Sequence, residues 1–431
     1  MAPRTLILLI LDGAADRPVD GRTPLSEAKT PGLDSLASSA VCGFHYPVGP
    51  GIAPESDLAT ISLLGYEPDR YYTGRGPLEA LGAGMSLREG HEVAFRANFA
   101  TIDPATRRII DRRVGRSLSS REAKELANAL DGMKLGEDGY ARVKATIGHR
   151  AVVIIGSKSR RLSAAVQNID PAYVRRGMIS EAVPNPKMVL PHCEPLEDKL
   201  EARETCRLVD EFIDKTIEIL DKHPINLDRA RRGLLKANAI LLRDAGDRLP
   251  RMPPVASIVG LKPAAAIAEM PVEIGIARAA SMKIYSVPPP SGDIAHDLPF
   301  RLQAVLDALA DGNRFIYVHL KGPDEPGHDG DFEKKKNAIE LIDKHFVQPL
   351  LKRIDLSEAA VLVTSDHATP WILKSHSGDP VPWMLAYKGL MNTGLSKFCE
   401  TVCEEKAIAR LEHGWELLPY VRRLLEEGGT Q

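Results

Sequence analysis

The sequence has few cysteines, almost no net charge and no long apolar stretch. Its five cysteines among 431 residues are irregularly spaced, which favours a reducing compartment over a disulfide framework. A formal net charge of −2 gives no electrostatic reason to expect nucleic acid or an acidic membrane as partner. No stretch approaches the roughly 20 apolar residues of a membrane span, and Leu6–Leu11 is too short for a signal peptide. We therefore expect a soluble cytoplasmic protein.

The composition is that of an ordinary globular protein, with 44% hydrophobic and 26% charged residues. At roughly 100–200 residues per domain, the length predicts two domains, or one domain with an insertion. A helix is predicted where Ile339, Ile342, Phe346 and Leu350 recur at helical spacing. Short apolar runs indicate buried strands at Leu6–Leu11, Phe315–His319, Val361–Thr364 and Trp383–Tyr387. This alternation predicts an α/β core whose mainly parallel sheet is flanked by helices.

The middle of the chain differs from its two ends, because it is richer in charge. One helix is predicted from the capping box Ser119–Glu122, and a longer one from about Glu201 to Lys222. Prolines stop regular structure in the segment Arg248–Pro254. We predict an inserted α+β domain at residues 91–249, which divides the core into residues 1–90 and 250–431.

Carboxylates and imidazoles stand where the predicted strands end. They are Asp12, Asp324, His328, Asp366, His367 and, nine residues after the last of these, His376. Because ligands bind at the carboxyl ends of the strands in an open α/β sheet, we expect these side chains to converge. Carboxylates and neutral imidazoles suit Mn²⁺, Zn²⁺ or similar divalent ions. Two such ions about 3.5–4 Å apart can stabilise an in-line phosphoryl displacement.

Ser56 is the candidate nucleophile. It precedes a short helix predicted at residues 57–64, where free amides and the helix dipole favour a phosphate group. A divalent ion on its oxygen would lower the pKa of the hydroxyl. Simpler interpretations remain open, because Ser56 or Asp366 could be a helix N-cap and Asp12 could belong to an Asp-Gly turn. A loop histidine could also be solvated or merely hydrogen-bonded.

Several motifs resemble the archaeal-type cofactor-independent phosphoglycerate mutases, which belong to the alkaline phosphatase superfamily. The motifs are Leu8–Gly13, Glu55–Asp57 with Leu64–Pro68, Lys321–Gly330, and Thr364–Pro370 with His376–Pro380. The resemblance runs in the same order over nearly the whole chain. It implies an isomerase that interconverts 3-phosphoglycerate and 2-phosphoglycerate in glycolysis and gluconeogenesis. It also implies a phosphoserine intermediate at Ser56 and no need for bisphosphoglycerate.

The resemblance implies two divalent ions, with Mn²⁺ favoured over Zn²⁺, Co²⁺ or Mg²⁺. One ion would be held by Asp324, His328 and His376. The other would be held by Asp12, Asp366 and His367, with Ser56 bridging towards them. In this family an inserted domain closes over the core, and arginine forks can bind phosphate or carboxylate in two places at once. The implied substrate-binding residues of this domain are Arg96, Asn98, Asp111, Arg112, His149, Arg150, Arg243 and Asp244, with Arg116 as a further candidate.

The segment Glu55–Thr60 departs from the family pattern. Archaeal members usually carry Ser-Asp-Thr-Ala-His after a small residue, whereas this chain reads Glu55-Ser-Asp-Leu-Ala-Thr60. The alternative is therefore a related phosphotransferase or phosphatase that acts on another small phosphorylated metabolite. A non-enzymatic binding relative is disfavoured, because all seven expected site residues are present. The expected partner is a small anionic substrate, and an oligomer is compatible with the sequence.

Overall fold

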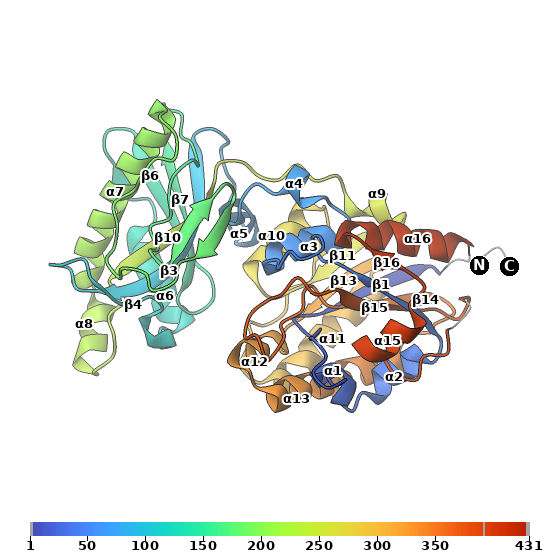
Figure 1. The fold of residues 1–431 in the computed structure, drawn as a ribbon. Helices are drawn as coiled ribbons and strands as arrows, with labels where there is room; N and C mark the ends of the chain where they lie inside the picture. The colour runs from blue at the N-terminus through green and yellow to red at the C-terminus, as the bar shows by residue number, and fades with distance from the viewer. Residues whose placement is uncertain (1–2, 391–392, 428–431) are drawn as a thin grey trace. The chain divides into compact units, whose positions relative to one another are not determined.

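A computed structural model describes residues 3–390 and 393–427 (Figure 1). The chain forms two compact units, one of residues 1–71 and 252–431 and the other of residues 72–251. The predicted insertion at residues 91–249 lies inside the second unit. That unit also takes in residues 72–90, because helix α5 (Arg75–Gly82) packs on its strands β3 (Glu92–Ile102) and β10 (Ala239–Gly246). The covering role expected of this domain stays a prediction.

The first unit is built on an eight-stranded sheet of order β12-β11-β13-β1-β14-β15-β2-β16. Its paired strands run parallel except for β15, which is antiparallel to both of its neighbours. The strands are β1 (Thr5–Leu11), β2 (Ala40–His45), β11 (Ala264–Ile267), β12 (Lys283–Ile284), β13 (Phe315–Leu320), β14 (Ala359–Thr364), β15 (Val381–Ala386) and β16 (Arg410–Leu411). The central strands are buried on both faces, so each is a continuous apolar run.

Helices cover both faces of this sheet, which confirms the predicted α/β fold (Figure 1). On one side lie α3 (Ser56–Leu63), α9 (Val255–Val259), α10 (Pro271–Ala279) and α16 (Leu417–Glu427). On the other lie α1 (Pro24–Glu27), α2 (Pro31–Ala37), α11 (Ile294–Ala310), α13 (Phe332–Ile342) and α15 (Glu400–Lys406). The helix α13 continues through a π-turn at Asp343–Val347 into α14 (Gln348–Leu351), and Ile339, Ile342, Phe346 and Leu350 are buried as their spacing predicts. Within residues 3–390 and 393–427, no helix combines the length and apolar character needed to cross a bilayer.

The second unit is built on an antiparallel sheet of order β10-β3-β7-β6-β5, with β4 (Ile109–Asp111) paired to β3. Its other strands are β5 (Lys134–Leu135), β6 (Gly139–Ala145), β7 (Arg150–Ser157) and the hairpin β8 (Tyr173–Arg176) with β9 (Ile179–Ala182). Its helices include α6 (Ser120–Leu130), α7 (Leu200–Asp221) and α8 (Pro224–Arg231). The predicted capping box is present, since Ser119 accepts a hydrogen bond from the Glu122 amide at the start of α6.

The two faces of this second sheet carry different side chains. Along β3, the side chains of Phe95, Ala97 and Phe99 pack into the main core of the unit. Because successive residues of a strand point to opposite faces, Arg96 and Asn98 belong to the other face. That other face therefore carries polar side chains, next to a small apolar cluster in which Ala94, Val152 and Ile154 pack with Ala80 of α5 and Met85.

One pair of cysteines does not follow the expectation of free thiols. Cys193 and Cys206 form a disulfide, because the chain turns back into α7 and brings their Cα atoms to 4.9 Å. The five cysteines are odd in number and irregularly spaced, so nothing in the sequence indicated this single disulfide. Cys42, Cys399 and Cys403 are free and buried.

We expect the thiol count to reveal this bond. Unfolded, unreduced protein should present three reactive thiols to a thiol reagent, and reduced protein should present five. Replacing both Cys193 and Cys206 by serine should cost about 3 kcal/mol of unfolding free energy, because the bond closes a 13-residue loop. Chemical denaturation of both proteins measures this difference. Five reactive thiols without reductant would contradict the assignment.

Candidate metal centre

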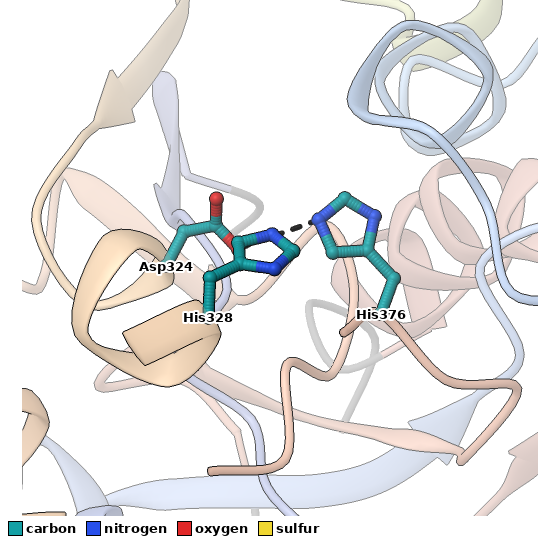
Figure 2. A group of neighbouring side chains, drawn as sticks. All are labelled: Asp324, His328 and His376. Atoms are coloured by element: carbon teal, nitrogen blue, oxygen red, sulfur yellow. Dashed lines mark ion pairs between the residues drawn. The ribbon is translucent and has the colours of Figure 1, made fainter. Parts of the chain in front are cut away.

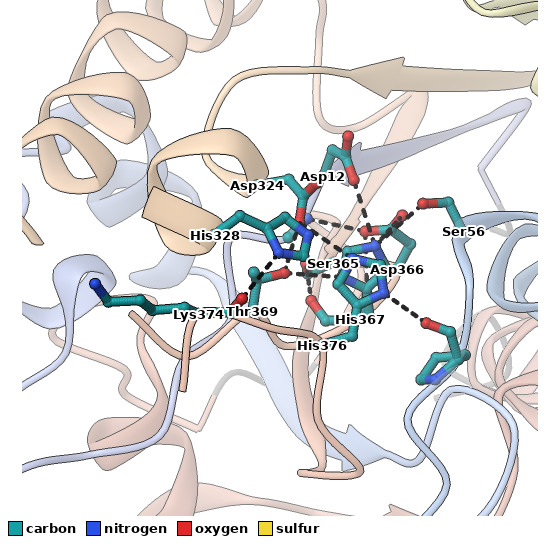
Figure 3. A network of polar contacts seen from close by, with 12 residues as sticks. Asp12, Ser56, Asp324, His328, Ser365, Asp366, His367, Thr369, Lys374 and His376 are labelled. Carbon is teal, nitrogen blue, oxygen red and sulfur yellow. Dashed lines mark hydrogen bonds and ion pairs between the residues drawn. The ribbon is translucent and has the colours of Figure 1, made fainter. Parts of the chain in front are cut away.

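The carboxylates and imidazoles at the strand ends lie together at one edge of the first sheet (Figure 3). Asp12 directly follows β1, and Asp366 and His367 follow the neighbouring strand β14. Asp324 and His328 stand one turn apart on the short helix α12 (Asp324–Asp329), where the sequence indicated only a turn-rich segment. His376 comes from the loop before β15.

Gly13 allows the loops after β1 and β13 to approach each other closely. Its φ is +61°, and a Cβ there would lie 2.7 Å from the Cβ of Asp324. Its amide donates to Oδ1 of Asp366 at 3.0 Å. The Asp12-Gly13 turn therefore helps to bring the residues of the cluster together. Asp12 can belong to this turn and also be a metal ligand, so the two interpretations are compatible. Asp366 is not a helix cap, because β14 is followed by loop and not by a helix.

Two groups of ligand atoms share the carboxylate of Asp324. In the first, its Oδ1 lies 3.4 Å from Nε2 of His376 and 3.5 Å from Nε2 of His328 (Figure 2). In the second, Asp12, Asp324 and His367 each offer a ligand atom within 4.8 Å of the others. Nε2 of His367 also lies 3.2 Å from Oδ2 of Asp366. All six predicted metal ligands therefore belong to one cluster, with Asp324 at its centre.

The three imidazoles are all oriented by their Nδ1 atoms. Nδ1 of His376 lies 2.7 Å from the carbonyl oxygen of Pro54, and Nδ1 of His328 lies 3.2 Å from that of Lys374. A carbonyl only accepts, so both Nδ1 atoms carry the proton and donate it. Nε2 of each ring therefore lies on the side that faces Asp324. Burial alone would lower the pKa of His376, but its contact with Asp324 raises it above the ordinary value.

Thr369 orients His367 in the same way. Its hydroxyl donates its single proton to Oδ1 of Asp324 at 2.7 Å. The contact of 3.0 Å between Nδ1 of His367 and the Thr369 oxygen must therefore be donated by the imidazole. Nε2 of His367 is left as an acceptor that faces the carboxylates of Asp12 and Asp366. Such a partner on the far side of the ring is typical of metal-bound histidine.

Burial makes the negative charge of this cluster costly. Oδ1 of Asp12 and Oδ2 of Asp366 are buried and make no hydrogen bond with any of the described residues. Burial raises the pKa of Asp366 well above its ordinary value, and the nearby charge of Asp12 raises it further. Burial lowers the pKa of His367 to about 3 and so keeps that ring neutral. Lone pairs and carboxylates that face each other in this way fit divalent cations, and the donor set suits Mn²⁺ or Zn²⁺.

A third acidic group, which the sequence analysis missed, is already neutralised by a lysine. Asp12, His319 and Asp366 lie close enough together to hold an ion. Nζ of Lys321, however, lies 2.8 Å from Oδ2 of Asp12 and 2.7 Å from Oε1 of Glu273. Burial alone would raise the pKa of Asp12, but Lys321 and the nearby imidazoles lower it well below its ordinary value. Lys321 stands inside a motif quoted above, whereas nothing in the sequence points to Glu273.

Ser56 is the first residue of α3, and its hydroxyl faces the cluster. Its Oγ lies 3.3 Å from Nε2 of His367 (Figure 3). The N-cap of the helix is Glu55, whose side chain makes no capping hydrogen bond, and in the first turn the Leu58 amide donates to Oδ1 of Asp57 at 3.0 Å. The simpler interpretation of Ser56 as a helix cap is therefore wrong, and its side chain is available for chemistry.

The second unit gathers four of its eight predicted substrate-binding residues on one face of its sheet. Arg243 on β10 stands opposite Arg96 on β3, and Asn98 on β3 stands opposite Arg150 on β7. Paired residues share a face, as do residues two apart on one strand. Burial, together with the nearby charge of Arg243, lowers the pKa of Arg96 to about 9. This sheet face (Arg96, Asn98, Arg150 and Arg243) is called the arginine face below.

The other four predicted residues have more varied surroundings. Asp244 follows Arg243 and lies 3.6 Å from its Nε. Arg112 is held by the buried carboxylate of Asp170. Burial lowers the pKa of His149 to about 4, and Arg150 adds to the effect. Asp111 closes a turn by accepting hydrogen bonds from the amides of residues 113 and 115, so it does not belong to the arginine face.

The sequence analysis also missed Arg75 on α5. Its Nε donates to Oε1 of Glu79 at 3.1 Å, and Glu79 also pairs with Arg96 at 3.8 Å. The backbone beside it packs closely, since a Cβ on Gly76 would lie 2.2 Å from the carbonyl oxygen of Ala94. Gly74 and Gly76, which flank Arg75, were the feature of the sequence that could have indicated this position, because they allow the backbone of α5 to lie close to β3 and β10.

Fold and cluster together define an α/β protein whose carboxylates and imidazoles are arranged for divalent ions. A family model described as 2,3-bisphosphoglycerate-independent phosphoglycerate mutase matches residues 37–226. A protein of that name from Aeropyrum pernix is 50% identical over 426 residues, which cover 97% of this chain and 99% of its own length. One from Archaeoglobus fulgidus is 37% identical over 424 residues, with 97% and 98% covered.

Solved structures agree with these relatives. A protein from Pyrococcus horikoshii matches with a TM-score of 0.77 and 27% identity over 99% of this chain and 98% of its own. The cofactor-independent phosphoglycerate mutase from Thermoplasma acidophilum matches with a TM-score of 0.62 and 29% identity, with 98% and 100% covered. The chain belongs to the family of 2,3-bisphosphoglycerate-independent phosphoglycerate mutases. The prediction that it is an enzyme of this family, an isomerase, is confirmed.

We expect Thr369→Val to weaken metal binding. The change removes the donor to Asp324 and the acceptor for His367 while it preserves side-chain volume. Loss of such a supporting hydrogen bond costs about 10- to 100-fold in metal affinity. Competition for Mn²⁺ with a chelating dye measures the affinity. Thr101→Val is the matched control, because Thr101 is a buried threonine of the other unit. Equal affinity of Thr369→Val and wild type would contradict the proposed orientation of His367.

Proposed function

We propose that the protein interconverts 3-phosphoglycerate and 2-phosphoglycerate through a phosphoserine at Ser56, without bisphosphoglycerate. The observation that carries the proposal is the position of Ser56. Its hydroxyl stands at the start of α3, does not cap the helix and donates towards Nε2 of His367. Free amides at a helix N-terminus favour a phosphate group, so the same position suits the phosphorylated side chain.

Two divalent ions, with Mn²⁺ favoured, complete the proposed site. Asp324, His328 and His376 would hold one, and Asp12, Asp366 and His367 the other. When bound, the ions supply charge neutralisation for the phosphoryl oxygens and a lower pKa for the Ser56 hydroxyl. The unbonded carboxylate oxygens of Asp12 and Asp366 and the Nε2 lone pairs support this assignment.

The proposed reaction has two balanced steps. In the first, Oγ of Ser56 loses its proton and bonds to phosphorus, the bond from phosphorus to the substrate O3 breaks, and O3 takes up a proton. In the second, the O2 hydroxyl of the bound glycerate loses its proton and bonds to phosphorus, while the bond to Ser56 breaks and Oγ regains a proton. The glycerate must stay bound between the steps and water must stay out, because hydrolysis of the phosphoserine would release free phosphate.

The arginine face supports a substrate with two anionic groups. The Nε atoms of Arg96 and Arg243 and Oδ1 of Asn98 are buried and make no hydrogen bond within the described parts of the chain. The Asn98 oxygen is an acceptor and calls for a donor, whereas the two Nε atoms are donors, and carboxylate and phosphate are the anions that a guanidinium binds best. A phosphoglycerate carries one of each. We propose that the second unit binds the substrate through these residues.

The residues beside the nucleophile leave the alternative in place. Glu55 is exposed, and Thr60 is buried on the same helix. A related phosphatase or phosphotransferase with this site would use the same Ser56 on another phosphorylated metabolite. The product separates the two functions, because a hydrolase releases free phosphate and a mutase only moves it. The cytoplasmic location and the role in glycolysis and gluconeogenesis belong to the same proposal.

The test of the mutase is an assay coupled to removal of 2-phosphoglycerate. Protein loaded with Mn²⁺ should turn over 3-phosphoglycerate without added bisphosphoglycerate. Treatment with a chelator should abolish turnover, and Mn²⁺ should restore it. Chelation should also lower the thermal midpoint, because a ligand at 100 times its Kd stabilises the fold by about 2.7 kcal/mol. Release of free phosphate without 2-phosphoglycerate would establish the phosphatase alternative.

Ser56→Ala should remove activity and leave the metal in place. Loss of a nucleophile costs on the order of 10⁴-fold or more in rate. Mass spectrometry of acid-quenched wild type should find phosphate on the peptide that contains Ser56. Ser62→Ala on the same helix is the matched control, since Ser62 is buried and lies two turns along. Activity retained by Ser56→Ala would show that another residue carries the phosphate.

A further inference from the structure

Tyr173, at the start of β8, contacts two arginines of the second unit. The centre of its ring lies 4.1 Å from Cζ of Arg243 and 5.1 Å from Cζ of Arg112. Both separations are within the roughly 6 Å at which a guanidinium is attracted to an aromatic face. A single ring therefore stabilises two like charges that repel each other.

The two arginines differ in how closely a carboxylate pairs with them. Arg112 donates from Nε and Nη2 to the carboxylate of Asp170, at 2.8 and 2.5 Å, and that carboxylate is buried. Arg243 has a carboxylate only at 3.6 Å, that of Asp244, and its Nε is without a hydrogen bond in the described residues. Arg112 is therefore held by the carboxylate of Asp170, whereas Arg243 lies against the ring of Tyr173.

The backbone fixes Tyr173 relative to Arg243. Nδ2 of Asn168 donates to the carbonyl oxygen of Tyr173 at 3.3 Å and to Oγ of Ser180 at 2.9 Å. Oδ1 of Asn168 accepts from the amide of Asp244 at 3.0 Å, and the Ser180 hydroxyl donates to the Asp244 carboxylate. One buried asparagine thus joins the hairpin to the strand that carries Arg243.

The strand itself is irregular at this point. The pairing of β10 with β3 shifts register between Arg243 and Gly246. Asp244 has a φ of +59°, a left-handed conformation that aspartate tolerates better than most residues. Bulges of this kind re-aim a side chain, and they are common beside active sites. The position of Arg243 is therefore set by the bulge and by Tyr173 together.

The charge around Tyr173 is positive. Burial alone would raise the pKa of its phenol, but Arg243 and Arg112 lower it below its ordinary value. This agrees with the geometry, in which Arg243 is only distantly paired with a carboxylate. An anion is the partner that this environment favours.

We propose that Tyr173 is a positioning residue for substrate binding. Its ring orients the Arg243 guanidinium so that it can bind an anionic group of the phosphoglycerate. The proposal rests on the proposed function for the identity of the substrate. The ring does the positioning, since it supplies the face on which the guanidinium lies. The phenol oxygen also interacts with both arginines, and the comparison of Tyr173→Phe with Tyr173→Leu separates its contribution from that of the ring.

The test compares three variants of the full chain, Tyr173→Leu, Tyr173→Phe and Ile179→Ala. Tyr173→Leu should weaken binding of 3-phosphoglycerate, measured by calorimetry, and raise KM, each about tenfold, which is equivalent to about 1.4 kcal/mol. Its kcat should change less than about threefold. Tyr173→Phe should restore both values to within about twofold of wild type. Ile179→Ala should change neither, because Ile179 is an exposed residue of the same hairpin.

Other outcomes would overturn the proposal. Wild-type affinity in Tyr173→Leu would exclude the positioning role, and an equal loss in Tyr173→Phe would assign the effect to the hydroxyl. If Tyr173→Leu unfolds at a lower temperature than Ile179→Ala, Tyr173→Met replaces it with the same expected loss. A wild type that binds 3-phosphoglycerate without isomerising it would refute the mutase and leave the binding comparison valid. A wild type that does not bind it would refute both.

Discussion

The first unit depends on one electrostatic constraint, namely that the Nε2 atoms of three imidazoles and the oxygens of three carboxylates face one another in a largely buried cluster. Nε2 of His328 and His376 points at Asp324, and Nε2 of His367 points at Asp12 and Asp366. Each ring is held in this tautomer by an acceptor on its other side. Within a buried site such an arrangement is unfavourable by itself, because Lys321 offsets the charge of Asp12 while Oδ2 of Asp366 has no hydrogen bond within the described residues. Divalent cations bound among these acceptors would make it favourable, which is the physical basis of the proposed metal site.

The chain holds this arrangement with charges that are not ligands. Lys335, on α13, is fully buried and donates to Asp16 and to the carbonyl oxygens of Ala15 and Thr369. It thereby joins the loop after β1 to the loop after β14, which carry ligands from neighbouring strands. Lys321 does the same for the other side of the cluster, through Asp12 and Glu273. Breaking a buried ion pair costs more than forming it gains, so these lysines restrict the loops to one arrangement.

The sequence predicted most of this edge and little of the second unit. The strands were predictable because buried parallel strands are continuous apolar runs, and every strand that precedes a ligand is one. Asp12, Asp366 and His367 follow their strands within three residues, and the other predicted ligands lie in nearby segments, so local sequence was enough to suggest their convergence. Glu273 and Tyr173 carry no local signal, because they meet Lys321 and Arg243 only through tertiary packing. The disulfide was missed for the same reason, since the return of the chain into α7 brings its cysteines together.

Each unit, taken by itself, buries polar atoms that make no hydrogen bond within the described residues. In the first unit they include carboxylate oxygens of Asp12 and Asp366, and in the second the Nε atoms of Arg96 and Arg243. Burying an unpaired polar group costs about 1–3 kcal/mol, and more when the group is charged. The protein bears this cost in both units before any ligand is bound. In the second unit, a substrate that carries both a phosphate and a carboxylate would offer an anion to each of the two Nε donors, whereas inorganic phosphate would leave one of them unpaired. A substrate with two anionic groups would then be bound in preference to a smaller anion, because the smaller anion leaves buried polar groups without a partner.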